Sequence, residues 1–299
     1  MQIDRLRRMA LFAMVVRHGS FSAASRAMDL ATSALSSAVS QLEKELEVRL
    51  LNRTTRSLSL TESGQLYYEK CVEMLATAEL AEELVIGGAG EIAGRLRIAA
   101  ASDTAQKIVL PALAPLARKY PKLLLDILVD DQVVDMTTQA IDLSIRSGWL
   151  RDSSLVARKL NDLHEVLVAS PGYLERFGIP LSPDDLHQHR LVGFARFTEP
   201  ATLTLKNIDG HSTQIVLSLG AMTNNVSMLR DFALQGFGLA RLPSYMVLRE
   251  LEQGQLVLLL PSWELPGAGI YAVTLKRTLQ PPKVSAAIAA INEYIAAIQ

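Results

Sequence analysis

Residues 32–47 carry two opposed faces when they are placed on a helix. Apolar side chains recur along one face, at Leu35, Val39, Leu42 and Leu46. Polar side chains recur at the same spacing on the other, at Ser33, Ser37, Ser40 and Lys44, with Ser36 beside them. Such spacing places one set in a core and the other on a surface. Short hydroxyl side chains on a helix allow a close approach to another surface, as insertion into a major groove requires.

A solvated face is the alternative interpretation, although Lys, Glu or Ala would stabilise a solvent-facing helix better than serine does. The following residues, VRLLNRTTRSLSLTESG, favour a nucleic-acid partner. They predict a short hairpin in which Leu58 and Leu60 point inward and Arg49, Arg53 and Arg56 surround the turn. A basic hairpin beside such a helix can hold phosphates or enter a minor groove.

The charge is divided unequally along the chain. Residues 1–60 hold nine Lys and Arg against five Asp and Glu, a net charge of +4. Residues 61–299 hold 21 against 26, a net charge of −5, and together they give the total of −1. A polyanionic partner is therefore expected at the N-terminal end. Two shorter helices are predicted there, over residues 4–17 and 20–28, with Ser20 as the cap of the second.

The run FSAASRAMDLATSALSSAVSQLEKELEVRLLNRTTRSLSLTESG resembles the winged helix-turn-helix of LysR-type transcriptional regulators. Ser37, Ala38 and Ser40 stand where that family often carries Arg or Gln, so we expect fewer long bidentate base contacts and more dependence on groove shape. The resemblance implies a winged helix-turn-helix domain over residues 1–60 that binds double-stranded DNA at an operator inverted repeat. It implies DNA contacts at Thr32, Ser33, Ser36, Ser37, Arg53 and Arg56, with Thr32 as a helix cap or a phosphate contact.

Residues 61–90 predict a linker: one long helix over 61–85, capped by Thr61, and a hinge at Gly87–Gly90. A seam of small and apolar side chains repeats along it at Tyr67, Cys71, Met74, Ala78, Ala81 and Val85. Such a seam packs against a partner helix or against the chain's own body. The resemblance favours a homodimer through paired linker helices, with a homotetramer as the larger assembly. Cys71 is interpreted as a packing residue.

From residue 91 onward, predicted strands alternate with helices. RLRIAAA and LLLDILV predict buried strands, a short helix is expected through Val133–Ala140, and IYAVTLK returns to the first lobe. The fold class expected is α+β multi-domain, with a C-terminal two-lobed α/β effector domain of the periplasmic-binding-protein type by resemblance. Lobe I would comprise about 91–161 and 266–299, and lobe II about 162–265.

Ligands of such sheets bind beyond the carboxyl ends of strands, between lobes. The candidate effector-binding residues at these positions are Ser102, Thr104, Arg146, Ser147, Phe194, Asn224 and Asn225. Ser102 and Thr104 offer donors to a carboxylate, Arg146 a positive charge, and Phe194 a surface for stacking. Asp103 would oppose a bare anion, so it either points away or faces an effector that also carries a donor. Ordinary capping, or an ion pair of Arg146 with Asp142 or another carboxylate, is the alternative for each position.

Other motifs do not indicate catalysis or metal binding. His187 and His189 lack a third ligand at a recognisable spacing, so no metal is expected. The glycines at 236 and 238 follow a helix and precede a strand, the wrong order for a dinucleotide site. No nucleophile, base and orienting residue assemble, so no cofactor or enzymatic activity is expected. The single cysteine excludes a disulfide framework, and neither a signal peptide nor a bilayer-spanning run is apparent, which together predict a cytoplasmic protein.

These features predict a transcriptional regulator whose operator binding is modulated by a small effector, an organic or aromatic acid. Three alternatives remain: an α/β enzyme with an accessory DNA-binding domain, an exported solute-binding protein, and a ligand-independent architectural DNA-binding protein. A catalytic constellation or an export signal would favour the first two. Titration of operator affinity with small molecules separates the third from a switch.

Overall fold

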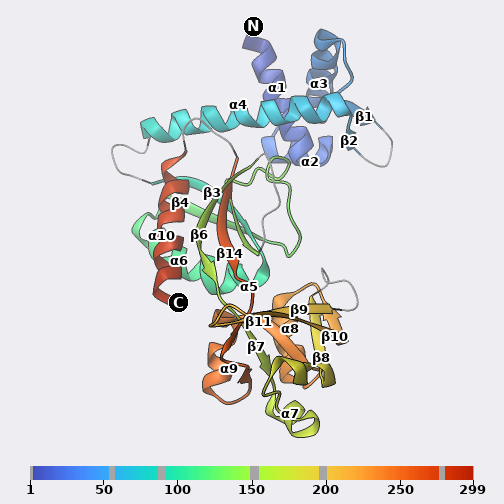
Figure 1. Ribbon diagram of the computed structural model, residues 1–299. Coiled ribbons are helices and arrows are strands. Elements are labelled where there is room, and N and C mark those ends of the chain that lie inside the picture. Colours follow the sequence, from blue (N-terminus) through green and yellow to red (C-terminus); the bar gives the residue numbers. More distant parts are fainter. Residues whose placement is uncertain are drawn as a thin grey trace. The chain divides into compact units, whose positions relative to one another are not determined.

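The computed structural model describes residues 3–53, 58–86, 92–148, 155–194, 201–275 and 280–298. It divides into two compact units. The first comprises residues 1–94 and 134–142, and the second comprises residues 95–133 and 143–299. Figure 1 shows helices and sheets mixed in the chain, with a helical N-terminal part, one long helix and an α/β remainder. The expected fold class is confirmed.

The first unit begins with three helices and a two-stranded wing. These are α1 (Ile3–Arg17), α2 (Phe21–Met28), α3 (Thr32–Leu46), β1 (Leu51–Arg53) and β2 (Leu58–Leu60). The Ser20 hydroxyl accepts a hydrogen bond from the Ala23 amide at 3.1 Å, so the predicted cap of α2 is confirmed. The core of this unit buries Phe12, Ala24, Leu35, Val39, Leu42 and Tyr68 completely. The apolar side of α3 therefore faces this core, as its spacing predicts.

The long helix α4 (Glu62–Ile86) starts where the wing ends. The Thr61 hydroxyl accepts from the Gly64 amide at 2.9 Å, which confirms Thr61 as its cap. A Cβ atom at residue 64 would collide with the carbonyl of Leu50, so only glycine lets the first turn of α4 approach the wing this closely. This contact explains the glycine at the end of the L-T-x-x-G motif.

The predicted seam of α4 divides in two. Tyr67 and Cys71 pack into the core of the first unit, and Cys71 is fully buried there. Tyr67 lies against Phe12, with ring centroids 6.0 Å apart. Part of the seam therefore has an intramolecular partner, because α4 closes one side of the three-helix core. Ala78 and Ala81, further along the same face, are exposed.

Lobe I of the second unit is built on a five-stranded sheet of order β4-β3-β5-β14-β6. The strands are β3 (Gly94–Ala100), β4 (Leu123–Val129), β5 (Leu143–Gly148), β6 (Val156–Leu163) and β14 (Ala268–Thr274). The helices are α5 (Ser102–Thr104), a π-helical turn (Ala105–Val109), α6 (Leu110–Lys119) and α10 (Pro282–Ile298). α10 packs against α6 and buries Val284, Ile288, Ile291 and Ile295. β14 returns to lobe I, as expected for IYAVTLK, and lies between β5 and β6.

Lobe II contains a seven-stranded sheet of order β12-β7-β11-β8-β10-β9-β13. The strands are β7 (Glu165–Ala169), β8 (Arg190–Phe194), β9 (Ala201–Asn207), β10 (Ser212–Thr223), β11 (Leu239–Pro243), β12 (Val257–Leu259) and β13 (Trp263–Glu264). The helices are α7 (Pro171–Phe177), α8 (Val226–Leu234) and α9 (Leu248–Glu252), with 3-10 turns at Pro183–Gln188 and Ser244–Met246. Parallel β8 and β10 end together, with Phe194 opposite Thr223. Their common end places Phe194 close to the start of α8.

The helix expected through Val133–Ala140 is wrong, because the structure has a series of turns there. The Asp135 carboxylate accepts from the amides of Thr137 and Thr138 at 2.8 and 3.2 Å. These bonds start a turn at Asp135 rather than a helix at Val133, and the left-handed backbone of Ala140 (φ 50°) ends that turn before a helix can continue.

Candidate functional sites

The polar face of α3 lies at the surface of the first unit. Thr32, Ser33 and Ser37 are exposed and Ser36 is half-buried. Thr32 is not the helix cap, contrary to one of the two expectations for it. Ala31 has the extended backbone of the cap position (φ −62°, ψ 134°), and Thr32 is already helical. Thr32 therefore remains a candidate phosphate contact only.

Two glutamates fix α3 relative to its neighbours. The Glu43 carboxylate accepts from the backbone amides of Leu50 and Leu51 at 2.8 and 3.1 Å and so joins α3 to the wing. Glu45 forms ion pairs with Arg5 at 3.3 Å and Arg8 at 2.7 Å and joins α3 to α1. Burial would raise the pKa of Glu45, but hydrogen bonds from Gln41 and Arg5 and the charges of the two arginines lower it. The exposed face of α3 is thus held on a rigid support.

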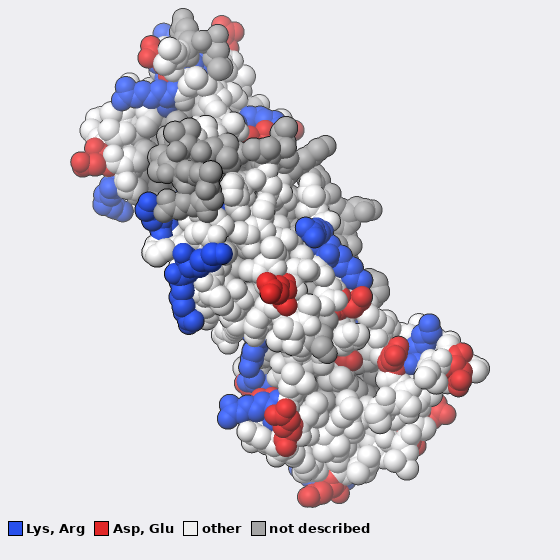
Figure 2. Space-filling model, turned by 90° about the vertical axis from the view of Figure 1, so that its left-hand side faces the viewer, with Lys and Arg blue, Asp and Glu red and all other residues white. Residues whose placement is uncertain are grey.

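The wing pairs Leu51 with Leu60 and Arg53 with Leu58. Arg49, just before it, is exposed. The side chain of Arg53 and the whole of Arg56 lie outside the described residues, so both stay predictions. On the face drawn in Figure 2, basic and acidic side chains are interspersed and separated by broad uncharged areas. The net charge of +4 over residues 1–60 therefore remains the main electrostatic indication of a polyanionic partner.

A hydrogen-bonded network joins the two lobes at the end of β3. The Asp131 carboxylate accepts from the backbone amide and the hydroxyl of Ser102, both at 2.9 Å. From lobe II, the side-chain amide nitrogen (Nδ2) of Asn225 donates to the Asp131 carboxylate at 2.6 Å and to the Ser102 hydroxyl at 2.8 Å. The side-chain oxygen (Oδ1) of Asn225 also caps α8 by accepting from the backbone amide of Met228 at 2.9 Å. Asn225 is therefore both an ordinary cap, as its alternative interpretation holds, and a direct link between the lobes.

A second, more buried contact joins the lobes beside the first. The Tyr245 hydroxyl donates to the Asp103 carboxylate at 2.7 Å, and the hydroxyls of Thr104 and Ser147 lie 3.3 Å apart. Burial raises the pKa of Asp103, although hydrogen bonds from Tyr245 and Thr104 oppose the increase. Burial and then the Asp103 charge raise the pKa of Tyr245 well above its usual value. Asp103 and Tyr245 thus form a buried polar contact between the lobes.

The remaining candidates are placed less closely together. Arg146 is half-buried, and its Nε donates to the Ser144 hydroxyl at 3.3 Å. Alternation along β5 directs Arg146 to the opposite face from Ser147. Burial lowers the pKa of Arg146, and none of the carboxylates within the described residues forms an ion pair with it. Phe194 is half-buried at the end of β8, and Asn224 is exposed.

Sequence reasoning missed Asp131 and Tyr245. Asp131 follows closely after β4, the strand LLLDILV, so the rule that selected Ser102 after its own strand applies to it equally. The expectation that this strand is buried is wrong, because β4 is an edge strand of the lobe I sheet and Leu124 and Val129 are exposed. Tyr245 follows β11 in the same way, but its contact with Asp103 joins residues 142 positions apart. Only the folded chain reveals that partner.

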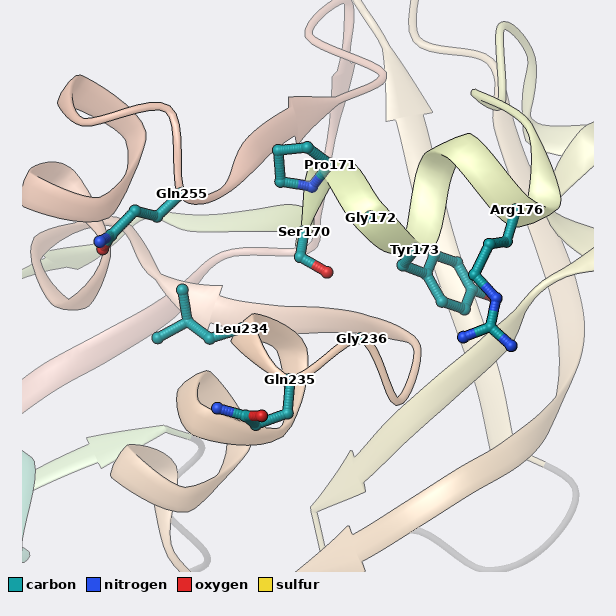
Figure 3. Close-up of a pocket in the computed structure, with 9 residues that line it drawn as sticks. All are labelled: Ser170, Pro171, Gly172, Tyr173, Arg176, Leu234, Gln235, Gly236 and Gln255. Carbon is teal, nitrogen blue, oxygen red and sulfur yellow. The ribbon is translucent and has the colours of Figure 1, made fainter.

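A separate cavity of about 620 Å³ lies entirely within lobe II (Figure 3). Its lining consists of Ser170, Pro171, Gly172, Tyr173, Arg176, Leu234, Gln235, Gly236 and Gln255. In the view of Figure 3, Ser170 lies centrally, with Gln255 and Arg176 on opposite sides. The seven predicted effector residues do not line it. This cavity is distinct from the network between the lobes.

Metal and membrane features are absent from the described parts of the chain. Nowhere in those parts do three or more His, Cys, Asp or Glu side chains gather in a way that could hold a metal ion. His189 is buried, and its Nδ1 lies 3.3 Å from the Tyr173 hydroxyl. In the same ranges, each helix is too short or too polar to cross a bilayer.

Two family models match the chain in consecutive order. The bacterial regulatory helix-turn-helix protein model of the lysR family covers residues 6–65, and the LysR substrate binding domain model covers residues 89–296. The chain belongs to the LysR family of transcriptional regulators. Members of this family bind DNA through the N-terminal domain and small-molecule effectors through the C-terminal one, and they are not enzymes.

Several transcriptional regulators are similar to this chain over nearly its full length. The HTH-type transcriptional regulator PtxR of Pseudomonas aeruginosa is 39% identical over 285 residues, which are 95% of this chain and 91% of PtxR. The transcriptional activator AaeR of Escherichia coli is 34% identical over 98% of this chain and 94% of its own. The full-length structure of the Vibrio cholerae virulence activator AphB is 30% identical, covers 98% of this chain and 99% of its own, and has a TM-score of 0.61. This LysR-type chain therefore shares both sequence and fold with regulators along its whole length.

Proposed function

We propose that this LysR-type regulator binds a specific operator and that a small molecule held between its two lobes modulates that binding. The Asn225 link to Ser102 and Asp131 carries the proposal, because it places polar groups of both lobes at one point. A ligand that replaces these contacts would favour one lobe arrangement over another. Such a ligand can shift the equilibrium between two lobe arrangements only by the difference between its binding free energies for them.

The division of labour follows the same order along the chain. Residues 1–60 read DNA, residues 61–90 link and dimerise, and residues 91–299 sense the effector. In the head, the exposed hydroxyl face of α3 is suited to base edges, with Arg53 and Arg56 on the phosphates. We place this activity in the cytoplasm, with access to the chromosome.

The effector proposed is a small organic or aromatic acid. Arg146 is the proposed partner of its carboxylate, supported by a half-buried guanidinium that pairs with no carboxylate in the described ranges. Phe194 would stack on its apolar body, beside the Asn225 cap. Ser102, Thr104, Ser147 and Asn224 complete the proposed set. Because Ser147 and Arg146 face opposite sides of β5, an effector that contacts both must extend past the end of this strand.

We propose a homodimer through α4, and a homotetramer formed from two such dimers. Leu66 is 62% exposed on α4, and Ala78 and Ala81 are exposed beyond the intramolecular core. Two heads related by a two-fold axis would meet two half-sites of an inverted repeat. Analytical ultracentrifugation of the full chain, alone and with a duplex that carries one inverted repeat, measures whether dimers or tetramers form.

The experiment that tests DNA reading is the salt dependence of operator affinity. Replacing Arg53 and Arg56 with Ala removes up to four phosphate contacts from a dimer, so the slope of log K against log salt should fall by about 3 to 4. Affinity for every duplex should fall together, because phosphate contacts carry no sequence information. A loss confined to one sequence would exclude this role. The matched control is the double substitution of Arg158 and Lys206 with Ala, which removes the same charge from residues 95–299.

A ligand-independent architectural protein is the second candidate. Operator affinity or footprint that stays constant across a panel of small acids would favour it. A footprint that changes with one acid would favour the switch.

A further inference from the structure

Asp131 occupies the donors that sequence reasoning assigned to the effector. Ser102 was expected to offer its amide and hydroxyl to a carboxylate, and both already donate to Asp131 at 2.9 Å. A carboxylate of the chain itself therefore takes the position expected for a carboxylate of the ligand. A carboxylate of the ligand at this point would lie at hydrogen-bond distance from the negative charge of Asp131. The repulsion between the two would weaken binding of that ligand.

The remaining capacity of Asp131 is for a donor. A carboxylate has about four acceptor positions. One oxygen takes the two Ser102 bonds, and the other takes the Asn225 amide at 2.6 Å. Asp131 is half-buried, so part of the residue remains open to an incoming group. The Asn225 amide is the donor that bridges the lobes here, and an incoming donor could join or replace it.

Asp131 also stays ionised. Burial would raise its pKa, but the hydrogen bonds from Ser102 and Asn225 lower it below the usual value. The second carboxylate nearby, Asp103, is already bonded to Tyr245. The chain itself thus supplies hydrogen-bond donors to both acidic groups at the lobe boundary, Asp131 and Asp103.

We propose that Asp131 is a specificity-determining residue: it excludes a carboxylate from the Ser102 donors and selects effectors that present an ammonium, amidinium, amide or hydroxyl group there. The proposal rests on the proposed function, in which the effector binds between the lobes. An effector acid must then carry a donor as well, as an amino acid or a hydroxy acid does, with its own carboxylate directed away from Ser102.

Benzoate and benzamidine test this directly, because they share one aromatic ring and carry opposite charges. Their dissociation constants are measured by calorimetry on the full chain, with tryptophan fluorescence during heating as a second readout. Both tryptophans, at 149 and 263, lie in the half that contains Asp131. Wild type should bind benzamidine more tightly than benzoate. Asp131→Ala frees the Ser102 donors and should lower the benzoate dissociation constant by about tenfold or more.

Two further variants make the result decisive. Asp130→Ala is the matched control, because Asp130 is adjacent and exposed and its carboxylate accepts only the nearby Gln132 amide at 2.8 Å in the described contacts. It should behave as wild type does. Asp131→Asn keeps the shape without the charge, guards against misfolding of the alanine variant, and should lose the preference for benzamidine.

The proposal is overturned if wild type binds benzoate as tightly as Asp131→Ala does, if Asp130→Ala gives the same gain, or if no variant binds either probe. None of these measurements uses DNA. Failure here with normal salt-dependent operator binding would therefore refute the role of Asp131 and leave the proposed regulator intact.

Discussion

Replacing Glu43 with Ala should uncouple α3 from the wing. Glu43 accepts from the amides of Leu50 and Leu51, and those two residues are only 1% and 2% exposed. Without the carboxylate, two poorly solvated N–H groups lose their acceptor. Each such loss costs about 1–3 kcal/mol, so the head should lose about 2–4 kcal/mol after partial compensation by water.

This loss of folding free energy is large for the first unit. In a domain of under a hundred residues, each kcal/mol lowers the midpoint of thermal unfolding by about 4–8 °C, so the head should unfold at least about 8 °C earlier. Both tryptophans lie outside residues 1–94 and report on the sensor half alone. Anisotropy of a labelled operator during heating reports on the head, because only the head binds the duplex. The tryptophan transition should stay in place.

Glu62→Ala is the control for this prediction. It removes one carboxylate from an exposed position in the first turn of α4 and leaves no buried amide unsatisfied. Only the helix-dipole contribution is lost there, which is about 0.3–1 kcal/mol. Equal destabilisation by the two substitutions would refute the reasoning that the Glu43 bonds hold α3 and the wing together.

Three other substitutions or treatments test separate parts of the structure. Arg146→Ala should abolish the effector response while basal operator binding persists; an unchanged response in a footprint titration would remove Arg146 from the proposed site. Burial raises the pKa of Cys71 to about 12, so a thiol reagent at pH 8 should label it only after unfolding, and rapid native labelling would contradict its packing role. Burial raises the pKa of Asp103 in the folded state, so the stability of wild type relative to Asp103→Asn should be greatest below about pH 4 and decrease as pH rises through the folded pKa. Urea denaturation at several pH values, followed by tryptophan fluorescence, would reveal the opposite trend if the carboxyl group were stabilised as an anion.

The head was predictable because its determinants are local. The spacing of Leu35, Val39 and Leu42 defines one helix face, and Ser20 and Thr61 lie at caps whose partners are three residues away. The wrong helix at 133–140 has a local cause too, since Asp135 bonds its own turn. Apolar periodicity alone does not report that competition.

The site was only partly predictable because its contacts are distant in sequence. Strand-end reasoning found Ser102 and Asn225, which prove to be bonded across 123 positions. The same reasoning could have selected Asp131, which follows β4 and bonds to both of them, but a sequence does not indicate which strand ends come together in the folded chain. The same limit applies to the seam of α4. Its periodicity predicts which side chains share one face, but not whether the chain itself or a second copy covers Tyr67 and Cys71.

Selection of binding sites from a random duplex library, with the purified full chain at physiological salt, tests the central claim most directly. Recognition by α3 predicts enrichment of an inverted repeat that is bound at least about a thousandfold more tightly than scrambled duplex. Ser37→Glu, which places a negative charge on the exposed face of α3, should remove that preference. Recovery of no common sequence, or equal affinity for selected and scrambled duplexes with candidate effectors present, would contradict the account.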